Sequence, residues 1–241
     1  MSRKVPTAVR FERPLSGVDL VIFTVREEQL QVLLAQRPAR PSEPFPHAWA
    51  LPGGLIDVER DASLEACARR KLAEKTGVAT PYLEQLGGWG NNTRDPRGWS
   101  ATHVYFALMP GPGIEPKAGG YAADARWHTV RGHGVEVRLA FDHAEILATA
   151  IERLRSKVEY TSLPAFLLPE EFTLSDLQRV YEIVLDRSLN KSAFRTRVRD
   201  AGLIVEVPRL RSGPNRPAQL YRLRDRRQPV FFPRTFSPRG D

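Results

Sequence analysis

A cluster of charged side chains follows a glycine-containing turn in the first third of the chain. Pro52-Gly53-Gly54 predicts a turn whose backbone can approach a ligand closely, because glycine has no Cβ atom. A helix is predicted from Ser63 to about Thr76, with Gly77 as its C-terminal cap. Four charged residues of this helix share one face, namely Arg70, Lys71, Glu74 and, at the edge, Lys75. The net positive charge of this face beside the glycines favours a binding site for a pyrophosphate. A merely solvated basic face is the alternative.

This segment resembles the signature of the Nudix hydrolases, in which a Gly-Gly loop precedes a helix that reads Arg-Glu-Leu-x-Glu-Glu-x-Gly. The chain reads Arg-Lys-Leu-Ala-Glu-Lys-Thr-Gly over 70–77, and its Gly54-to-Arg70 spacing is two residues longer than the pattern. In active family members, glutamates of the signature hold Mg²⁺. The matching positions here are Ala62, Lys71, Glu74 and Lys75, of which only Glu74 keeps a carboxylate.

Mg²⁺ requires oxygen ligands, and two ammonium groups at ligand positions would repel it. Without the metal nothing activates water or neutralises the charge on the scissile pyrophosphate. We therefore expect a helix that holds a nucleotide diphosphate without hydrolysing it, with no catalytic residues, metal site or cofactor.

Other residues are expected to hold the ends of such a ligand. The loop 89–99 is rich in donors and aromatic rings, and Asp95-Pro96 favours a turn within it. An arginine–aspartate brace around that turn is the structural alternative, and Trp49 fits a base-stacking or a core role equally well. The further predicted ligand contacts are Arg37, Trp49, Arg94, Arg97 and Trp99.

Composition places the chain among soluble cytoplasmic proteins. Its 241 residues are 41% hydrophobic, enough for two domains, and contain neither an apolar N-terminal segment nor a run long enough to span a membrane. The single cysteine, Cys67, excludes an internal disulfide and is interpreted as a small helix residue, not a nucleophile.

Positive charge is concentrated near the C-terminus. The net charge is +8, and between Arg187 and Arg239 the sequence has 14 Lys and Arg against 3 Asp and Glu. A localised basic block of this kind is typical of a nucleic-acid-binding surface.

The order of predicted elements gives the first domain an α/β sandwich over about 12–160. Strands are expected at 18–25, 30–37, 81–86, 100–109 and 125–130. A second helix is expected to begin at Asp142, with Glu145 as its capping-box partner, and to end near Tyr160. This order matches the α/β/α sandwich that the Nudix resemblance implies. Residues 161–172, which contain two prolines, are expected to form a linker.

Residues 173–241 are predicted to form a winged helix-turn-helix. A helix begins at Thr173, a basic helix covers 191–201, and strands at 203–207 and 218–223 flank a basic tip at 208–217. In such modules the second helix enters the major groove and the wing contacts phosphates. The predicted DNA contacts are Lys191, Ser192, Arg195, Arg197, Arg199, Arg211, Asn215 and Arg216. A solvated basic face is the alternative for the helical residues.

The whole chain resembles the Nudix-related transcriptional regulators of NAD biosynthesis. The resemblance rests on the segments 70–77, 90–99 and 140–143, the last reading Ala-Phe-Asp-His. It implies a homodimeric repressor of NAD-synthesis or salvage genes that releases its DNA on binding ADP-ribose or a related NAD-derived nucleotide. A two-fold dimer would bind a pseudo-palindromic operator in double-stranded DNA.

Two other functions remain open at this stage. The chain could be an active Nudix hydrolase of ADP-ribose or nucleoside diphosphate derivatives, with Glu74 and one of Asp57, Glu59 or Asp61 rebuilding a metal site and a tail that binds nucleic acid. It could also be an RNA-binding module with a vestigial nucleotide domain, which would show no preference for palindromic duplex DNA.

Overall fold

The computed structural model describes residues 13–41, 43–77, 80, 82–111, 115–116, 122–212 and 217–232. The elements of the first domain are β1 (Leu15–Arg26), β2 (Gln29–Gln36), β3 (Trp49–Ala50), β4 (Gly53–Leu55), α1 (Leu64–Thr76), β5 (Tyr82–Asn91), β6 (Ser100–Leu108), β7 (Asp124–Thr129) and α2 (His143–Val158).

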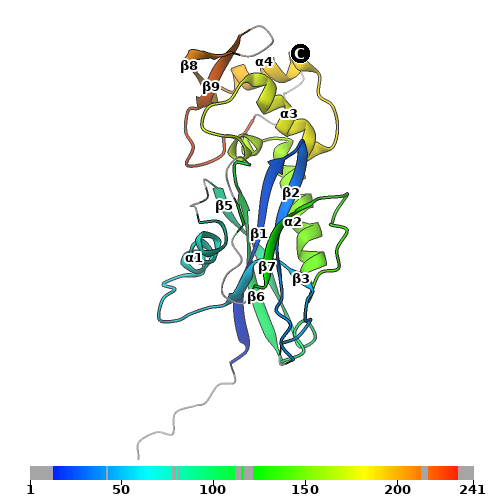
Figure 1. Ribbon diagram of the computed structural model, residues 1–241. Helices are drawn as coiled ribbons and strands as arrows, with labels where there is room; N and C mark the ends of the chain where they lie inside the picture. The colour runs from blue at the N-terminus through cyan, green and yellow to red at the C-terminus, as the bar shows by residue number, and fades with distance from the viewer. Residues whose placement is uncertain are drawn as a thin grey trace, which may run out of the picture.

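The strands form one mixed sheet between two helices. Its order is β3-β2-β1-β6-β5, with β4 paired to β1 and β7 paired to β2; β1 and β6 run parallel. Figure 1 shows α1 on one side of this sheet and α2 on the other. The run 20–23 in β1 is buried throughout because alternate residues face the two helices: Leu20 and Ile22 pack with the α1 side, Val21 and Phe23 with the α2 side. The predicted α/β/α sandwich is confirmed.

The predicted start and end of α1 are confirmed, whereas the predicted capping box of α2 is wrong. Ser63 Oγ accepts a hydrogen bond of 3.1 Å from the Ala66 amide, and Gly77 has the left-handed φ of 73° that ends α1. Asp142 precedes α2 but makes no side-chain cap bond, because both of its carboxylate oxygens accept hydrogen bonds from Arg94 at 2.8 Å. Glu145 instead accepts a bond of 3.2 Å from the Trp89 indole.

Two segments predicted as turn and loop are partly strand. Gly53–Leu55 forms β4, paired antiparallel with Gly17–Asp19 of β1. β5 continues past the expected end at 86 to Asn91, because it pairs with β6 along its whole length. The register of this pairing shifts once, between Gln85 and Gly87. The irregular part of the expected loop is therefore 92–99. The glycines of β4 and β5 suggested turns in both segments. In the structure, β4 pairs with β1 and β5 pairs with β6, and this pairing satisfies the backbone groups of both strands.

The C-terminal elements have the order of a winged helix. They are the 3₁₀ helix η1 (Leu163–Leu167), α3 (Leu174–Leu185), α4 (Lys191–Asp200), β8 (Ile204–Arg211) and β9 (Ala218–Leu223). The predicted α3 start is confirmed by a capping box, in which Asp176 and Thr173 exchange bonds of 2.8 and 3.1 Å. β8 is longer than expected, so Arg211 lies in a strand. Asn215 and Arg216 lie outside the described residues.

The two parts of the chain share one hydrophobic core. The cluster on the α2 side of the sheet continues through η1 into α3 and α4, and includes Leu154, Phe166, Leu177 and Phe194. The expected linker is therefore folded: all five residues of η1 are buried. Figure 1 shows the winged helix stacked on one end of the sandwich. Among the described residues, no helix is both long and apolar enough to cross a bilayer.

Candidate functional site

An ion-pair network takes up two of the four predicted charges on α1. Arg70 donates to both carboxylate oxygens of Asp61 at 2.7 Å, and its Nη1 donates to Glu74 at 3.0 Å. The bonds from Arg70 hold the pKa of Asp61 well below its usual range, and Asp61 in turn raises the pKa of Arg70. Two of the carboxylates considered for a metal site, Asp61 and Glu74, are thus bound to the same guanidinium.

Lys71 differs from its neighbours because its side chain is buried. It is 8% exposed, and its ammonium points at the second glycine of β4: a Cβ atom on Gly54 would lie 3.1 Å from Lys71 Nζ. Within the described part of the chain, Lys71 has no hydrogen-bond or ion-pair partner. Burial lowers the pKa of the nearby Lys75, and the positive charge of Lys71 lowers it further. An anion at this position would offset the repulsion between the two ammonium groups.

The glycines of β4 fit closely against β1. A Cβ atom on Gly53 would lie 2.0 Å from Asp19 Oδ1 and 2.6 Å from the backbone oxygen of Val18. The adjoining Leu20 amide donates to the Pro52 oxygen at 2.7 Å. Gly53 is therefore required for strand packing next to Asp19, whatever ligand the neighbouring Gly54 faces.

Replacing Gly53 with alanine is expected to destabilise the fold by about 1–3 kcal/mol, because the new methyl group meets backbone as well as side chain. Thermal unfolding followed by circular dichroism measures this loss. Gly134→Ala is the matched control, since no atom lies within 4 Å of its added Cβ. Equal melting temperatures for the two variants would contradict the packing argument.

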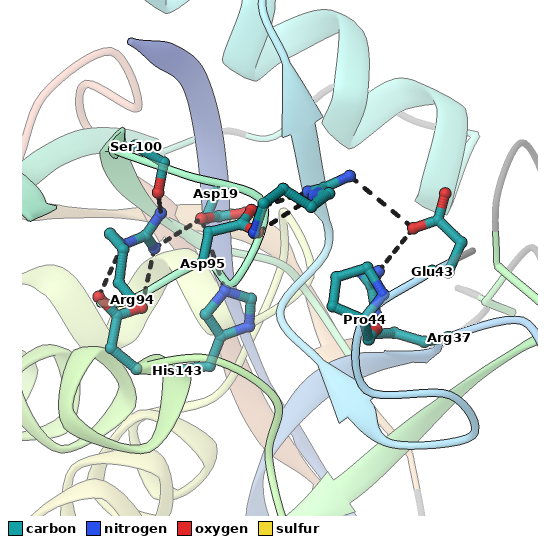
Figure 2. A network of polar contacts seen from close by, with 10 residues as sticks. Asp19, Arg37, Glu43, Pro44, Arg94, Asp95, Ser100 and His143 are labelled. Atoms are coloured by element: carbon teal, nitrogen blue, oxygen red, sulfur yellow. Dashed lines mark hydrogen bonds and ion pairs between the residues drawn. The ribbon is translucent and has the colours of Figure 1, made fainter. Parts of the chain in front are cut away.

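A second polar cluster lies on the other side of Asp19 (Figure 2). Asp19 Oδ2 is 3.6 Å from His143 Nε2 and 3.9 Å from Arg94 Nη2, and His143 Nδ1 accepts a bond of 2.9 Å from the Leu51 amide. Burial works to raise the pKa of Asp19, but the neighbouring His143 and the charge of Arg94 outweigh it and hold the pKa below its usual value. Sequence reasoning missed Asp19. The sequence feature that could have identified Asp19 is its position as a single carboxylate inside the apolar run of β1.

The other predicted arginines are held by acidic neighbours. Arg97 donates to both oxygens of Asp95, at 3.1 and 2.8 Å. Figure 2 shows Arg37 beside Glu43, to which it donates at 2.8 Å. The arginine–aspartate brace is thus present around the turn. Contact of these arginines with a ligand remains a prediction.

The two predicted tryptophans have different surroundings. Trp49 is half-buried and meets His128 edge to face, with ring centroids 4.5 Å apart. Trp99 is 51% exposed. Lys71 beside Gly54, and Asp19 between Gly53 and Arg94, bring four of the predicted ligand residues together around β4.

α4 presents most of its basic residues outward. Phe194 and Val198 face the core, while Lys191, Ser192 and Arg199 are exposed. Arg195 is half-buried, and its Nε has no hydrogen-bond partner within the described ranges. This face therefore offers positive charge at the surface.

Two further basic residues of the predicted DNA surface are engaged within the protein. Arg197 donates 2.8 Å to the Glu159 backbone oxygen and lies 4.7 Å over the ring of Phe232. Arg211 of β8 donates 2.7 Å to Asp176. Their donors would have to leave these partners to reach DNA.

Comparison with protein families matches both parts of the chain. The NUDIX domain model matches residues 15–150, and the model described as the NrtR DNA-binding winged helix domain matches residues 164–223.

Relatives extend the match to the whole chain. The "ADPR responsive transcriptional repressor NtrR" of Acinetobacter baylyi is 44% identical over 93% of this chain and 88% of its own length. The crystal structure of Shewanella oneidensis NrtR with a 27mer DNA covers 90% of this chain and 96% of that one, at 41% identity and a TM-score of 0.79. The Nudix domain of the same Shewanella protein complexed with ADP-ribose is 45% identical, covering 60% of this chain and 90% of that one, with a TM-score of 0.54. This chain therefore belongs to the NrtR family of transcriptional repressors, which join a Nudix domain to a DNA-binding winged helix.

Proposed function

We propose that this chain is an ADP-ribose-responsive repressor of NAD-synthesis or salvage genes. Its winged helix binds operator DNA, and ADP-ribose bound in the Nudix domain causes release. Support comes from the Acinetobacter repressor and from the two Shewanella complexes, one with DNA and one with ADP-ribose. The observation in this structure that carries the ligand assignment is the largely buried side chain of Lys71, whose ammonium lies beside Gly54.

In the proposed ligand site, Lys71 and Lys75 take the pyrophosphate. Arg70 and Glu74 stay paired with each other and hold the start of α1 in place through Asp61. Gly54 leaves room for the phosphates beside the ammonium. The ends of the nucleotide lie toward the second group of predicted contacts, which is Arg37, Trp49, Arg94, Arg97 and Trp99.

The residues do not fit the Mg²⁺ ion on which Nudix hydrolases depend. Lys71 and Lys75 stand at positions that carry metal ligands in the Nudix signature, and Arg70 binds both Asp61 and Glu74. Among the described residues, no group of three or more His, Cys, Asp or Glu could hold a metal ion. We therefore propose that ADP-ribose is bound and not hydrolysed.

The proposed recognition helix is α4, whose exposed face carries Lys191, Ser192, Arg195 and Arg199. Backbone phosphates position such a helix, and its side chains read base edges in the major groove. The wing contributes through the region of Arg211, Asn215 and Arg216. We propose domain limits of 12–160 and 173–241 for the sensing and DNA-binding parts, joined by 161–172.

A homodimer would place two recognition helices on a pseudo-palindromic operator, with half-sites about one DNA turn apart. Release follows if ADP-ribose prefers the arrangement in which the two helices are badly spaced for DNA. The cytoplasm, where both NAD metabolites and DNA are present in a bacterial cell, is the proposed location.

A gel shift tests the proposal, using labelled duplex DNA from the promoter region beside the gene for this chain. We expect a shifted band that disappears as ADP-ribose is added. Incubation with ADP-ribose and Mg²⁺, followed by chromatography for AMP, tests the hydrolase alternative. Turnover at an enzymatic rate would replace the repressor proposal, and equal binding to RNA and to duplex DNA would favour the RNA-binding alternative.

A further inference from the structure

One arginine of α4 is attached to the Nudix domain. Arg197 Nη2 donates 2.8 Å to the backbone oxygen of Glu159, the residue that follows α2. Carbonyl groups at a helix C-terminus have no partner inside the helix and carry the negative end of its dipole. The guanidinium of Arg197 thus caps α2, and the ring of Phe232, 4.7 Å away, holds it from the other side.

The opposite end of α2 is attached to the proposed ligand site. His143 Nδ1 accepts the Leu51 amide proton at 2.9 Å, and the Ala140 amide donates to the Trp49 oxygen at 2.8 Å. Asp142 holds Arg94 through two bonds of 2.8 Å. The segment that leads directly into Gly53 and Gly54 is therefore bound to the first turn of this helix.

α2 can transmit a displacement from one end to the other. Its 16 residues span about 24 Å, and their buried face packs in the same core as Phe194 and Val198 of α4. Near its C-terminal end, Arg155 donates 3.1 Å to the Val184 oxygen at the end of α3. Close packing transmits small shifts instead of absorbing them.

The domain junction is hollowed on the side of the β1–β2 turn. A polar cavity of about 450 Å³ lies between the β1–β2 turn and α3. The ion pair of Glu28 with Arg179 crosses this side, and both side chains are more than half exposed. Exposed pairs of this kind contribute little stability. The Glu28–Arg179 pair therefore adds little to the attachment of α3 beside this cavity.

We propose that Arg197 is a positioning residue that couples the ligand site to the recognition helix through α2, and that it is not a DNA contact. This inference rests on the proposed function. Ligand binding around β4 displaces the start of α2. The Glu159 carbonyl at the other end of α2 then moves, and Arg197 and α4 move with it. The two recognition helices of the dimer are then no longer at the distance that the DNA half-sites require.

The test is Arg197→Met, which keeps an unbranched stem over Phe232 and removes the guanidinium. Fluorescence anisotropy with labelled promoter duplex gives two quantities: the slope of log affinity against log salt concentration, and the factor by which saturating ADP-ribose weakens binding. We expect an unchanged slope and a coupling factor reduced several-fold toward one. A phosphate contact would instead lower the slope by about one.

Arg199→Met is the matched control on the same helix and should lower the slope while keeping the coupling factor. Arg197→Lys, which can still donate to a terminal carbonyl, should restore part of the coupling. A lower slope in Arg197→Met, or a coupling factor equal to that of the wild type, overturns the inference. Absence of release by ADP-ribose in the wild type overturns the proposed function as well, so the two failures are distinguishable.

Discussion

Replacing Lys71 with methionine is expected to weaken ADP-ribose binding by roughly 10- to 150-fold. This factor corresponds to the loss of about 1.5–3 kcal/mol, the usual contribution of a hydrogen bond to a charged group. The ammonium lies beside Gly54 at the end of a largely buried side chain and has no partner among the described residues, so the pyrophosphate is its expected counter-ion. Isothermal titration calorimetry with ADP-ribose measures the change.

Methionine keeps an unbranched apolar stem in the largely buried position, so stability should be kept. Arg69→Met is the matched control, because Arg69 is exposed on the same helix and pairs with Glu65. Its affinity for ADP-ribose should equal that of the wild type. Unaltered affinity in Lys71→Met would remove this lysine from the ligand site.

Replacing Lys191, Arg195 and Arg199 together with alanine is expected to lower DNA affinity on the order of 100-fold at physiological salt. If each contacts a phosphate, the slope of log affinity against log salt concentration should fall by about three. Fluorescence anisotropy at several salt concentrations measures both quantities.

A second triple variant controls for the loss of net charge. Arg69, Arg131 and Arg138 are exposed on the Nudix domain, and their replacement with alanine removes the same three charges. This variant should keep the slope of the wild type. If both variants lose affinity equally, overall charge governs binding and α4 is not the DNA surface. Melting temperatures confirm that each variant is folded.

Local sequence was sufficient for the elements whose ends are set by neighbouring residues. α1 begins at Ser63 and ends at Gly77, and α3 begins with the Thr173–Asp176 capping box, because both ends of each hydrogen bond lie within a few residues. The strand β1 likewise followed from the apolar run at 18–25. The position of Lys71 in the signature helix was also readable, since helical periodicity alone assigns its face.

Partners distant in sequence were beyond that reasoning. Asp142 looked like a helix cap, but Arg94, 48 residues away, takes its carboxylate. Gly53 looked like a turn residue, but it is a strand residue packed against Asp19. Arg197 shares a basic helix with Arg199, and only packing shows that it reaches the end of α2.

For this protein, the sequence by itself determined the order of the elements, the two-part architecture and the positive charges at positions where a Nudix hydrolase carries metal ligands. The tertiary structure alone decided that Arg70 pairs with Asp61 and Glu74 and that the Lys71 ammonium lies beside Gly54. The physical reason is that helix faces and caps depend on neighbours along the chain, whereas the pairing of a buried charge depends on groups that only folding brings within hydrogen-bonding distance.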